Sequence, residues 1–468
     1  MSAFSARLAE LRARGLHRRT RLISGPQGPH TVVDGQPALM LCSNNYLGLA
    51  NHPQVREAAA DAAMRWGAGA GASRLVSGTM TIHGRLEERL AAFEGQQQAL
   101  LFGSGYLANT GVIAAMADKG GVICSDSLNH ASLIDGCRLS GAETFIYDHA
   151  DTEHLEWGLS RARGRQALIV TDSVFSMDGD VAPLAEIVQV AQRHGARLVV
   201  DEAHATGVVG PGGRGAVAAA GLEDHVDVVI GTLGKSFGSY GAYAACSSEI
   251  AEWLLNRART VIYSTAPPPP AIAAALAALN ILEQEPRRVD RLTANSRGLR
   301  EALRQNGFDI EESPSAIIPL VIGDADTTVA LCEELLKRGV FAQAIRPPTV
   351  PDGTSRLRLA VMATHRSSEL RDAAKTVSRA CQSLGLRAAA PAERGSDSVQ
   401  NMPASATPLR APVEPIGDDW SVLGTSPRRS REQVPGDGPL PIIVRRKRRS
   451  EPGKAPFDVE ADGLDRAA

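Results

Sequence analysis

The sequence has few cysteines, and they are scattered. Its 468 residues include six cysteines, and no two of them are close enough to form a C-x-x-C motif. This spacing argues against a zinc site and against a disulfide framework. We therefore expect no bound metal and a reducing, cytoplasmic environment.

Long apolar runs and a large net charge are also missing. No uncharged apolar stretch reaches the roughly 18 residues that a membrane span requires, and the nearest one, 266–282, has four consecutive prolines near its start. The arginine-rich first thirty residues lack the apolar core of a secretory signal. The formal net charge is only −2, which disfavours a broad nucleic-acid-binding surface. We expect neither a membrane nor a nucleic acid as a partner.

Aromatic residues are scarce, at 4%, but hydrophobic residues make up 43% of the chain. This composition supports a core built from Ala, Val, Leu and Ile, and the length suggests two domains with additional segments. We expect an N-terminal segment over 1–50, a large domain over 51–270, and a connecting helix with a small α+β domain over 271–387. The connecting helix is expected at 271 to about 295.

The composition changes after about residue 388. Eleven of the 27 prolines fall between Pro391 and Pro456, among many Ser, Gly, Asp and Glu residues. Such a segment has too little apolar area to offset its chain entropy. We expect a disordered tail over 388–468, in which the basic run 445–449 is a solvated feature or a docking motif.

Short apolar runs alternate with helical stretches between about residues 38 and 265. Continuous runs of this kind predict a mostly parallel sheet that helices cover on both faces. Ligands of such sheets bind outside the carboxyl ends of the strands, so the residues after each run are the candidates for chemistry. The expected strands are Gln97–Phe102, Val122–Cys124, Ala167–Thr171, Arg197–Val200 and Val226–Ile230.

Two adjacent strand ends carry complementary charges. Asp201 follows one expected strand, and Lys235 lies in a glycine-flanked loop after the next. A capping aspartate and a solvated lysine are the ordinary interpretations of each residue alone. Together they supply the lysine for a Schiff base and the carboxylate for a pyridinium nitrogen, both of which pyridoxal phosphate (PLP) requires.

A phosphate site is predicted at a third strand end. Gly103-Ser104-Gly105-Tyr106 follows the first strand and opens a helical stretch, and a helix N-terminus with glycine turns binds phosphate through free N–H groups. The run Gly67-x-Gly69-x-Gly71 partly resembles a dinucleotide fingerprint, but it lacks a preceding strand and the full spacing. We therefore favour PLP over a dinucleotide.

Five stretches together resemble the α-oxoamine synthases, which are fold-type I PLP enzymes. They are GASRLVSGT at 71–79, SLNHASLIDG at 127–136, VFSMDGD at 174–180, DEAHATGVVG at 201–210 and GTLGKSFGSYG at 231–241. The resemblance covers about residues 15–386. It implies an α/β fold of PLP fold type I, with a large domain that binds the cofactor and a smaller α+β C-terminal domain.

The resemblance implies a role for individual residues. Lys235 would form the Schiff base, Asp201 would pair with the pyridinium nitrogen, and His130 would stack on the ring, so these three are the expected catalytic residues. The further cofactor contacts would come from Gly105, Tyr106, Ser176, His204 and Thr232, and from Ser264 and Thr265 of a partner subunit in a homodimer. Asn45 and Arg358 would bind the amino-acid carboxylate, and Thr349 and Arg18 would contact the acyl substrate. Arg19 and Arg21 are alternatives to Arg18 for the same position in the alignment.

Two further stretches, 262–269 and 344–365, resemble one branch of the family. That branch condenses L-alanine with a pimeloyl thioester, carried by coenzyme A or acyl carrier protein, to 8-amino-7-oxononanoate in biotin biosynthesis. Three alternatives stay open: a sister synthase with another acyl donor or amino acid, a PLP-fold protein that acts mainly through its tail, and an ordinary aminotransferase.

Overall fold

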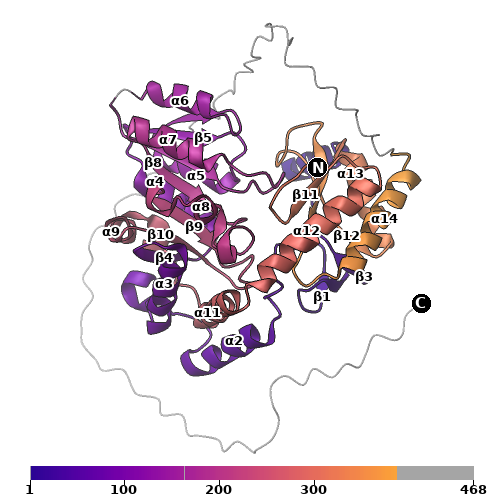
Figure 1. The fold of residues 1–468 in the computed structure, drawn as a ribbon, viewed down its shortest axis with the longest axis horizontal. Helices are drawn as coiled ribbons and strands as arrows, with labels where there is room; N and C mark the ends of the chain where they lie inside the picture. Colours follow the sequence, from indigo (N-terminus) through magenta and orange to yellow (C-terminus); the bar gives the residue numbers. More distant parts are fainter. Residues whose placement is uncertain (1, 163, 387–468) are drawn as a thin grey trace, which may run out of the picture. The chain divides into compact units, whose positions relative to one another are not determined.

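The computed structural model describes residues 2–162 and 164–386. The tail expected over 388–468, including its basic run, lies outside the described residues. Three β-sheets organise the described part, and Figure 1 shows the strands and helices along the chain. The predicted fold class, a mostly parallel sheet with a smaller α+β part, is confirmed.

The largest sheet has seven strands in the order β4-β10-β9-β8-β7-β5-β6. Strands β9, β8, β7, β5 and β6 run parallel, whereas β10 lies antiparallel between β9 and β4. Strands β6 and β10 were not among the strands predicted from the sequence. The bounds are β4 (Gln98–Phe102), β5 (Val122–Asp126), β6 (Glu143–Tyr147), β7 (Ala167–Asp172), β8 (Arg197–Asp201), β9 (Val228–Thr232) and β10 (Ala242–Cys246).

Helices cover both faces of this sheet. Successive residues of a strand point to opposite sides, and both sides of these strands carry apolar side chains that the helices bury. In β7, for example, Leu168 and Val170 join the core under α4, α5 and α9, whereas Ala167 and Ile169 join the core on the other face. This arrangement explains the continuous apolar runs of the strands. The helices of this part are α2 (Pro53–Trp66), α3 (Thr81–Glu94), α4 (Gly105–Met116), α5 (Ala131–Ser140), α6 (Thr152–Ser160), α7 (Leu184–His194), α8 (Gly215–Ala220), α9 (Ser248–Arg257), α10 (Arg259–Ile262) and α11 (Pro269–Gln284).

The C-terminal part contains a three-stranded antiparallel sheet in the order β11-β14-β13. Helices α12, α13 and α14 pack against one another or on this sheet. The bounds are α12 (Arg287–Gln305), β11 (Ile317–Gly323), α13 (Ala325–Lys337), β12 (Val340–Phe341), β13 (Gln343–Ile345), β14 (Ser355–Ala360) and α14 (Ser367–Ser383).

The N-terminal segment joins this C-terminal part through a small sheet. After α1 (Ala3–Ala13), strands β1 (Ile23–Ser24), β2 (His30–Val33) and β3 (Gln36–Met40) form a meander. Strand β3 pairs in parallel with β12. The N-terminal segment and the C-terminal part therefore share one sheet.

The connecting helix expected over 271 to about 295 is wrong in its bounds. The structure has two helices here, α11 and α12, which are separated at Glu285 and Pro286. Proline lacks an N–H donor and disfavours helical geometry in the residue before it, and Glu285 accordingly has φ −122° and ψ 60°.

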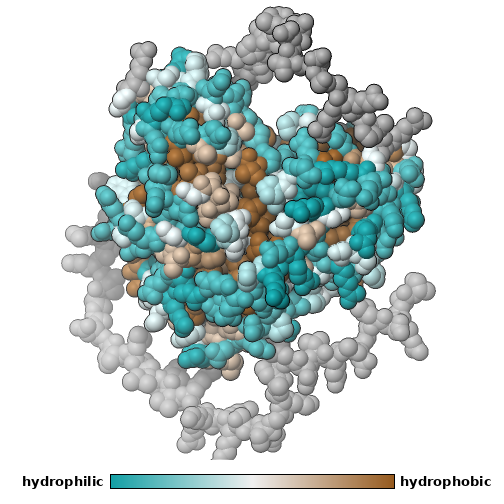
Figure 2. All heavy atoms as spheres, viewed as in Figure 1, coloured by the Kyte–Doolittle hydropathy of each residue, from teal (hydrophilic) through white to brown (hydrophobic). Residues whose placement is uncertain are grey.

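Figure 2 shows a largely hydrophilic surface over the helices on one face of the described part. Apolar side chains reach this surface mainly in a band beside α12, next to the part that carries the seven-stranded sheet. None of the helices in the described ranges combines the length and apolarity that a bilayer crossing would require.

Candidate active site

Four neighbouring parallel strands end at one edge of the large sheet. Their last residues are Asp126 in β5, Asp172 in β7, Asp201 in β8 and Thr232 in β9, and Asp172 and Asp201 are direct neighbours in the register. The carboxyl edge of a parallel sheet is the usual ligand site. The structure therefore brings the predicted strand-end residues together.

Asp201 is almost completely buried, and hydrogen bonds to both of its carboxylate oxygens fix its orientation. Its Oδ2 accepts a 2.6 Å hydrogen bond from the amide of Asn109 in α4, and its Oδ1 accepts one of 2.7 Å from the backbone of Ala203. The neighbouring Asp172 accepts a hydrogen bond from the His130 backbone, while burial and the nearby Asp201 raise its pKa well above the usual range. Two such close carboxyl groups favour ionisation of only one of them.

Lys235 lies against a histidine that the sequence also predicted. Its Nζ is 2.8 Å from Nε2 of His204, whose Nδ1 is 2.7 Å from the hydroxyl of Tyr46. Burial, followed by the nearby Lys235, lowers the pKa of His204 well below its usual range. Burial also lowers the pKa of Lys235 to about 8, against the opposing effect of Asp201. A neutral imidazole and an amine that readily loses its proton therefore lie side by side.

Arg358 of β14 approaches the same groups from the C-terminal part. It donates to Oδ1 of Asn44 at 3.0 Å, to the hydroxyl of Tyr46 at 3.2 Å and to the backbone carbonyl of Ser176. The side chain of Asn45, predicted to contact the amino-acid carboxylate, accepts from the backbone of Ala50, whereas its neighbour Asn44 contacts Arg358. The geometry thus favours Asn44 as the companion of Arg358.

The predicted phosphate site lies where α4 meets the end of β9. Ser104 caps α4 by accepting from the backbone of Leu107 at 3.3 Å. Gly105 lies beside Thr232, since a Cβ added to this glycine would be in ordinary van der Waals contact with the Thr232 side chain, at 3.9 Å. Tyr106, in the first turn, donates to Asp135. A helix N-terminus beside a hydroxyl is suited to a phosphate group.

For the remaining cofactor candidates, His130, Ser176, Ser264 and Thr265, the structure gives only contacts with other parts of the chain. His130 caps α5, its ring is exposed, and its Nδ1 is 2.7 Å from the hydroxyl of Ser132. The backbone carbonyl of Ser176 meets Arg358. Ser264 and Thr265 lie between α10 and α11, where Thr265 pairs with Ser73, and their role at a partner's cofactor stays a prediction.

The two acyl-substrate candidates, Arg18 and Thr349, lie close together. Arg18 donates to the backbone carbonyl of Pro347 at 3.3 Å, two residues before the exposed Thr349. Its competitors in the sequence, Arg19 and Arg21, both pair with Glu333. Among the described residues, Arg18 is the one of the three arginines that forms no ion pair, which favours it as a substrate ligand.

Four residues of the site were not predicted from the sequence: Asn44, Tyr46, Asn109 and Asp172. Asn109 lies in a mostly apolar helix, where a buried polar residue was the signal that could have indicated it. Asp172 was visible as the acidic residue that ends an apolar run, in the same way as Asp201.

The residues present fit PLP. A fixed carboxylate, a lysine with a lowered pKa and a glycine-containing helix N-terminus meet at one edge, and these groups match the ring nitrogen, the aldehyde and the phosphate of this cofactor. The amide oxygen of Asn109 is also buried without a hydrogen-bond partner among the described residues, which is consistent with a polar site.

Comparisons with known proteins agree with this chemistry. Residues 36–377 match the aminotransferase class I and II family. The 8-amino-7-oxononanoate synthase of Citrifermentans bemidjiense is 49% identical over 82% of this chain and 100% of its own length, and that of Anaeromyxobacter dehalogenans is 52% identical over 78% and 92%. A solved structure of serine palmitoyltransferase (SPT) with PLP has a TM-score of 0.79 and is 32% identical, over 82% of this chain and 98% of its own. The chain therefore belongs to the aminotransferase class I and II family of PLP-dependent enzymes and, within it, to the 8-amino-7-oxononanoate synthases.

Proposed function

We propose that the protein condenses L-alanine with a pimeloyl thioester to give 8-amino-7-oxononanoate, carbon dioxide and a free thiol, in biotin biosynthesis. The observation that carries the proposal is the 2.8 Å contact between Lys235 Nζ and His204 Nε2, beside Arg358. The proposal is supported by relatives of this activity that are about half identical to the chain over their full length.

PLP held by Lys235 supplies an electron sink that makes the α-proton of an amino acid acidic. Asp201 would keep a proton at the ring nitrogen, since Asn109 fixes its carboxylate. Arg358 would bind the carboxylate of L-alanine through paired N–H donors. Lys235, once alanine has taken its place, would accept the α-proton at Nζ.

The His204 ring links the protonation of Lys235 to Tyr46. A neutral imidazole donates at one nitrogen and accepts at the other. When the hydroxyl of Tyr46 donates to Nδ1, the ring donates from Nε2 to a neutral Lys235 amine; when that amine is protonated, the ring accepts from it. This pair of states would let Lys235 gain and lose a proton while its hydrogen bond to His204 is kept.

In the condensation, the α-carbon of alanine forms a bond with the thioester carbonyl carbon and the thiol leaves. The bond between the α-carbon and the carboxylate would then break, carbon dioxide would leave, and the α-carbon would take up a proton in its place. Arg18 and Thr349 would contact the acyl substrate at the edge of the site. The thioester carrier would be coenzyme A or acyl carrier protein.

The proposal includes a homodimer with shared sites in the cytoplasm. Val76 and Tyr263 are 78% and 71% exposed, and the pairing of Ser73 with Thr265 brings their segments together. An apolar surface beside Ser264 and Thr265 supports a subunit contact there. The cytoplasmic location is supported by six free cysteines.

The test is an incubation of the purified protein with PLP, L-alanine and pimeloyl-CoA, followed by mass identification of the product. We expect 8-amino-7-oxononanoate, and none from the matched Lys235→Ala protein. Glycine and L-serine in place of alanine test the sister-synthase alternative. A product from one of these amino acids, with none from alanine, would contradict the proposed substrate while keeping the family.

A further inference from the structure

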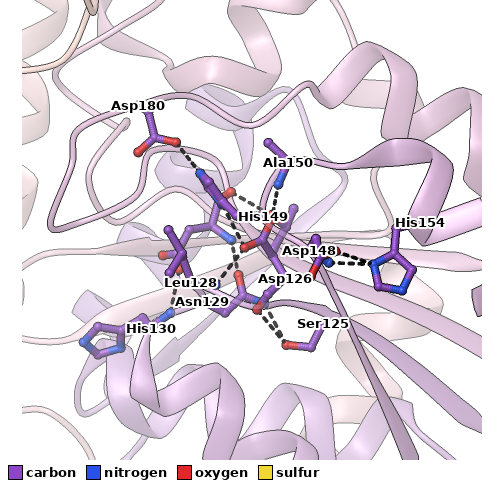
Figure 3. Close-up of polar contacts among 12 residues, drawn as sticks. Ser125, Asp126, Leu128, Asn129, His130, Asp148, His149, Ala150, His154 and Asp180 are labelled. Carbon is purple, nitrogen blue, oxygen red and sulfur yellow. Dashed lines mark hydrogen bonds and ion pairs between the residues drawn. The ribbon is translucent and has the colours of Figure 1, made fainter. Parts of the chain in front are cut away.

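We propose that His149 is a positioning residue for this reaction: it fixes the 173–182 loop, against which Arg358 is oriented. The inference rests on the proposed function, in which Arg358 binds the amino-acid carboxylate. His149 follows β6, at the same edge of the sheet as the site, and Figure 3 shows its ring between two carboxylates.

Both ring nitrogens of His149 are bound by carboxylates. Nδ1 is 2.9 Å from Oδ1 of Asp126, and Nε2 is 2.7 Å from Oδ2 of Asp180. An ionised carboxylate only accepts hydrogen bonds, so each nitrogen must carry a proton and the ring is an imidazolium. The ring also packs edge-on against Phe175, with centroids 4.4 Å apart. His149 therefore connects the end of β5 to both ends of the VFSMDGD stretch.

The surroundings of the ring hold it in this place. Asp126 is almost fully buried, and its second oxygen accepts a 2.9 Å hydrogen bond from the backbone of Ala150. Ala150 has φ 56°, which is uncommon for a residue with a Cβ. The chain thus adopts an unfavourable backbone conformation directly beside His149, and the Asp126 carboxylate that binds His149 also stabilises that conformation.

The far side of the 173–182 loop faces the substrate-binding arginine. The loop closes on itself through a 3.0 Å bond from the Phe175 backbone to the carbonyl of Asp180. Asp178 pairs with Arg356, and the carbonyl of Ser176 accepts from Arg358. The loop therefore contacts His149 through Phe175 and Asp180 and contacts Arg358 through Ser176, the residue after Phe175. This gives His149 a route to the substrate carboxylate.

The charges around His149 keep it protonated. The hydrogen bond to Asp126, followed by that to Asp180, raises the pKa of His149 to about 10. Asp178 is the third acidic group that faces it, while Asp148 next to it pairs with His154. Loss of the imidazolium would leave Asp126 and Asp180 facing each other without a cation, and their repulsion would displace the loop.

The experiment compares His149→Gln with His154→Gln, a matched control in the same segment. The dissociation constant of L-alanine is measured from the change in visible absorbance of the PLP-loaded protein, without thioester. We expect ~10-fold weaker alanine binding in His149→Gln, the factor that about 1.4 kcal/mol represents, with unchanged PLP affinity and an unchanged KM for pimeloyl-CoA. The control should match the wild type.

A second variant covers the case in which His149→Gln does not fold. Asp180→Asn removes one partner of the ring on a partly exposed loop and should weaken alanine binding in the same way. The double variant should bind alanine little worse than either single variant, because both substitutions break the same contact between His149 and Asp180.

Two outcomes are kept apart by this design. If both variants bind alanine as the wild type does and lose only thermal stability, His149 is a structural residue and the proposal is wrong. If the wild type binds PLP but does not respond to L-alanine, the proposed substrate fails, and the same titration with glycine or L-serine still tests His149.

Discussion

The side-chain amide of Asn109 donates a 2.6 Å hydrogen bond to Oδ2 of Asp201. Asn109 lies in the second turn of α4, the helix whose first turn is predicted to hold the cofactor phosphate. One helix would therefore position two separate parts of the same cofactor, the phosphate and the ring nitrogen.

Replacement of Asn109 by Ala should slow the reaction by roughly 10- to 100-fold, since a hydrogen bond to a charged group contributes about 1.5–3 kcal/mol. Asn109→Asp should be more damaging, because a second carboxylate would favour protonation of Asp201. Steady-state kinetics at saturating PLP check both variants. The neighbouring Thr110→Val, which loses only a bond within the helix, is the control; wild-type kinetics in Asn109→Ala would contradict the assignment.

The proposed binding site for the alanine carboxylate can be tested by substituting two adjacent asparagines. Asn44 accepts from Arg358, whereas Asn45 closes a local turn onto Ala50. Asn44→Ala should therefore raise the KM for L-alanine by roughly 10-fold, and Asn45→Ala should mainly lower the melting temperature. Arg358→Lys should raise the KM more than either, because lysine cannot form the paired contact. A larger KM effect from Asn45→Ala would restore the expectation drawn from the sequence.

Much of the site could be predicted because buried parallel strands have a simple pattern. Asp201 and Lys235 each follow an apolar run, and neighbouring runs place their ends at one edge. Strand β10 was missed because its sequence, AYAAC, is rich in alanine, which is a poor strand former. Its place between β9 and β4 depends on tertiary packing rather than on its own sequence.

The contacts between distant segments could not be predicted from local patterns. Asn44 and Arg358 are 314 positions apart in the sequence, and only the pairing of the N-terminal and C-terminal strands brings them together. His149 gave no signal of its own, because its two partners, Asp126 and Asp180, follow different strands. Residues that act through other residues are the ones a single sequence reveals least.

The stabilising effect of His149 should depend on pH. Its pKa is raised to about 10 in the folded protein, above the value of about 6.5 expected for an unfolded chain. The contribution is therefore complete below about pH 6.5 and is lost as the pH rises toward 10. The difference in melting temperature between the wild type and His149→Gln should be largest near pH 6 and shrink steadily above it. A difference that stays constant over this range would contradict a charged ring.

The capture of PLP by the cofactor-free protein should also depend on pH, through Lys235. Only a neutral amine attacks the aldehyde of PLP, and burial lowers the pKa of Lys235 to about 8. The rate of PLP uptake, followed by visible absorbance, should rise through pH 7 and 8 and then level off. Because Asp201 raises this pKa, Asp201→Asn should shift the rise to lower pH. A rise centred near pH 10.5, the ordinary value for lysine, would show that the amine is not desolvated as the structure indicates.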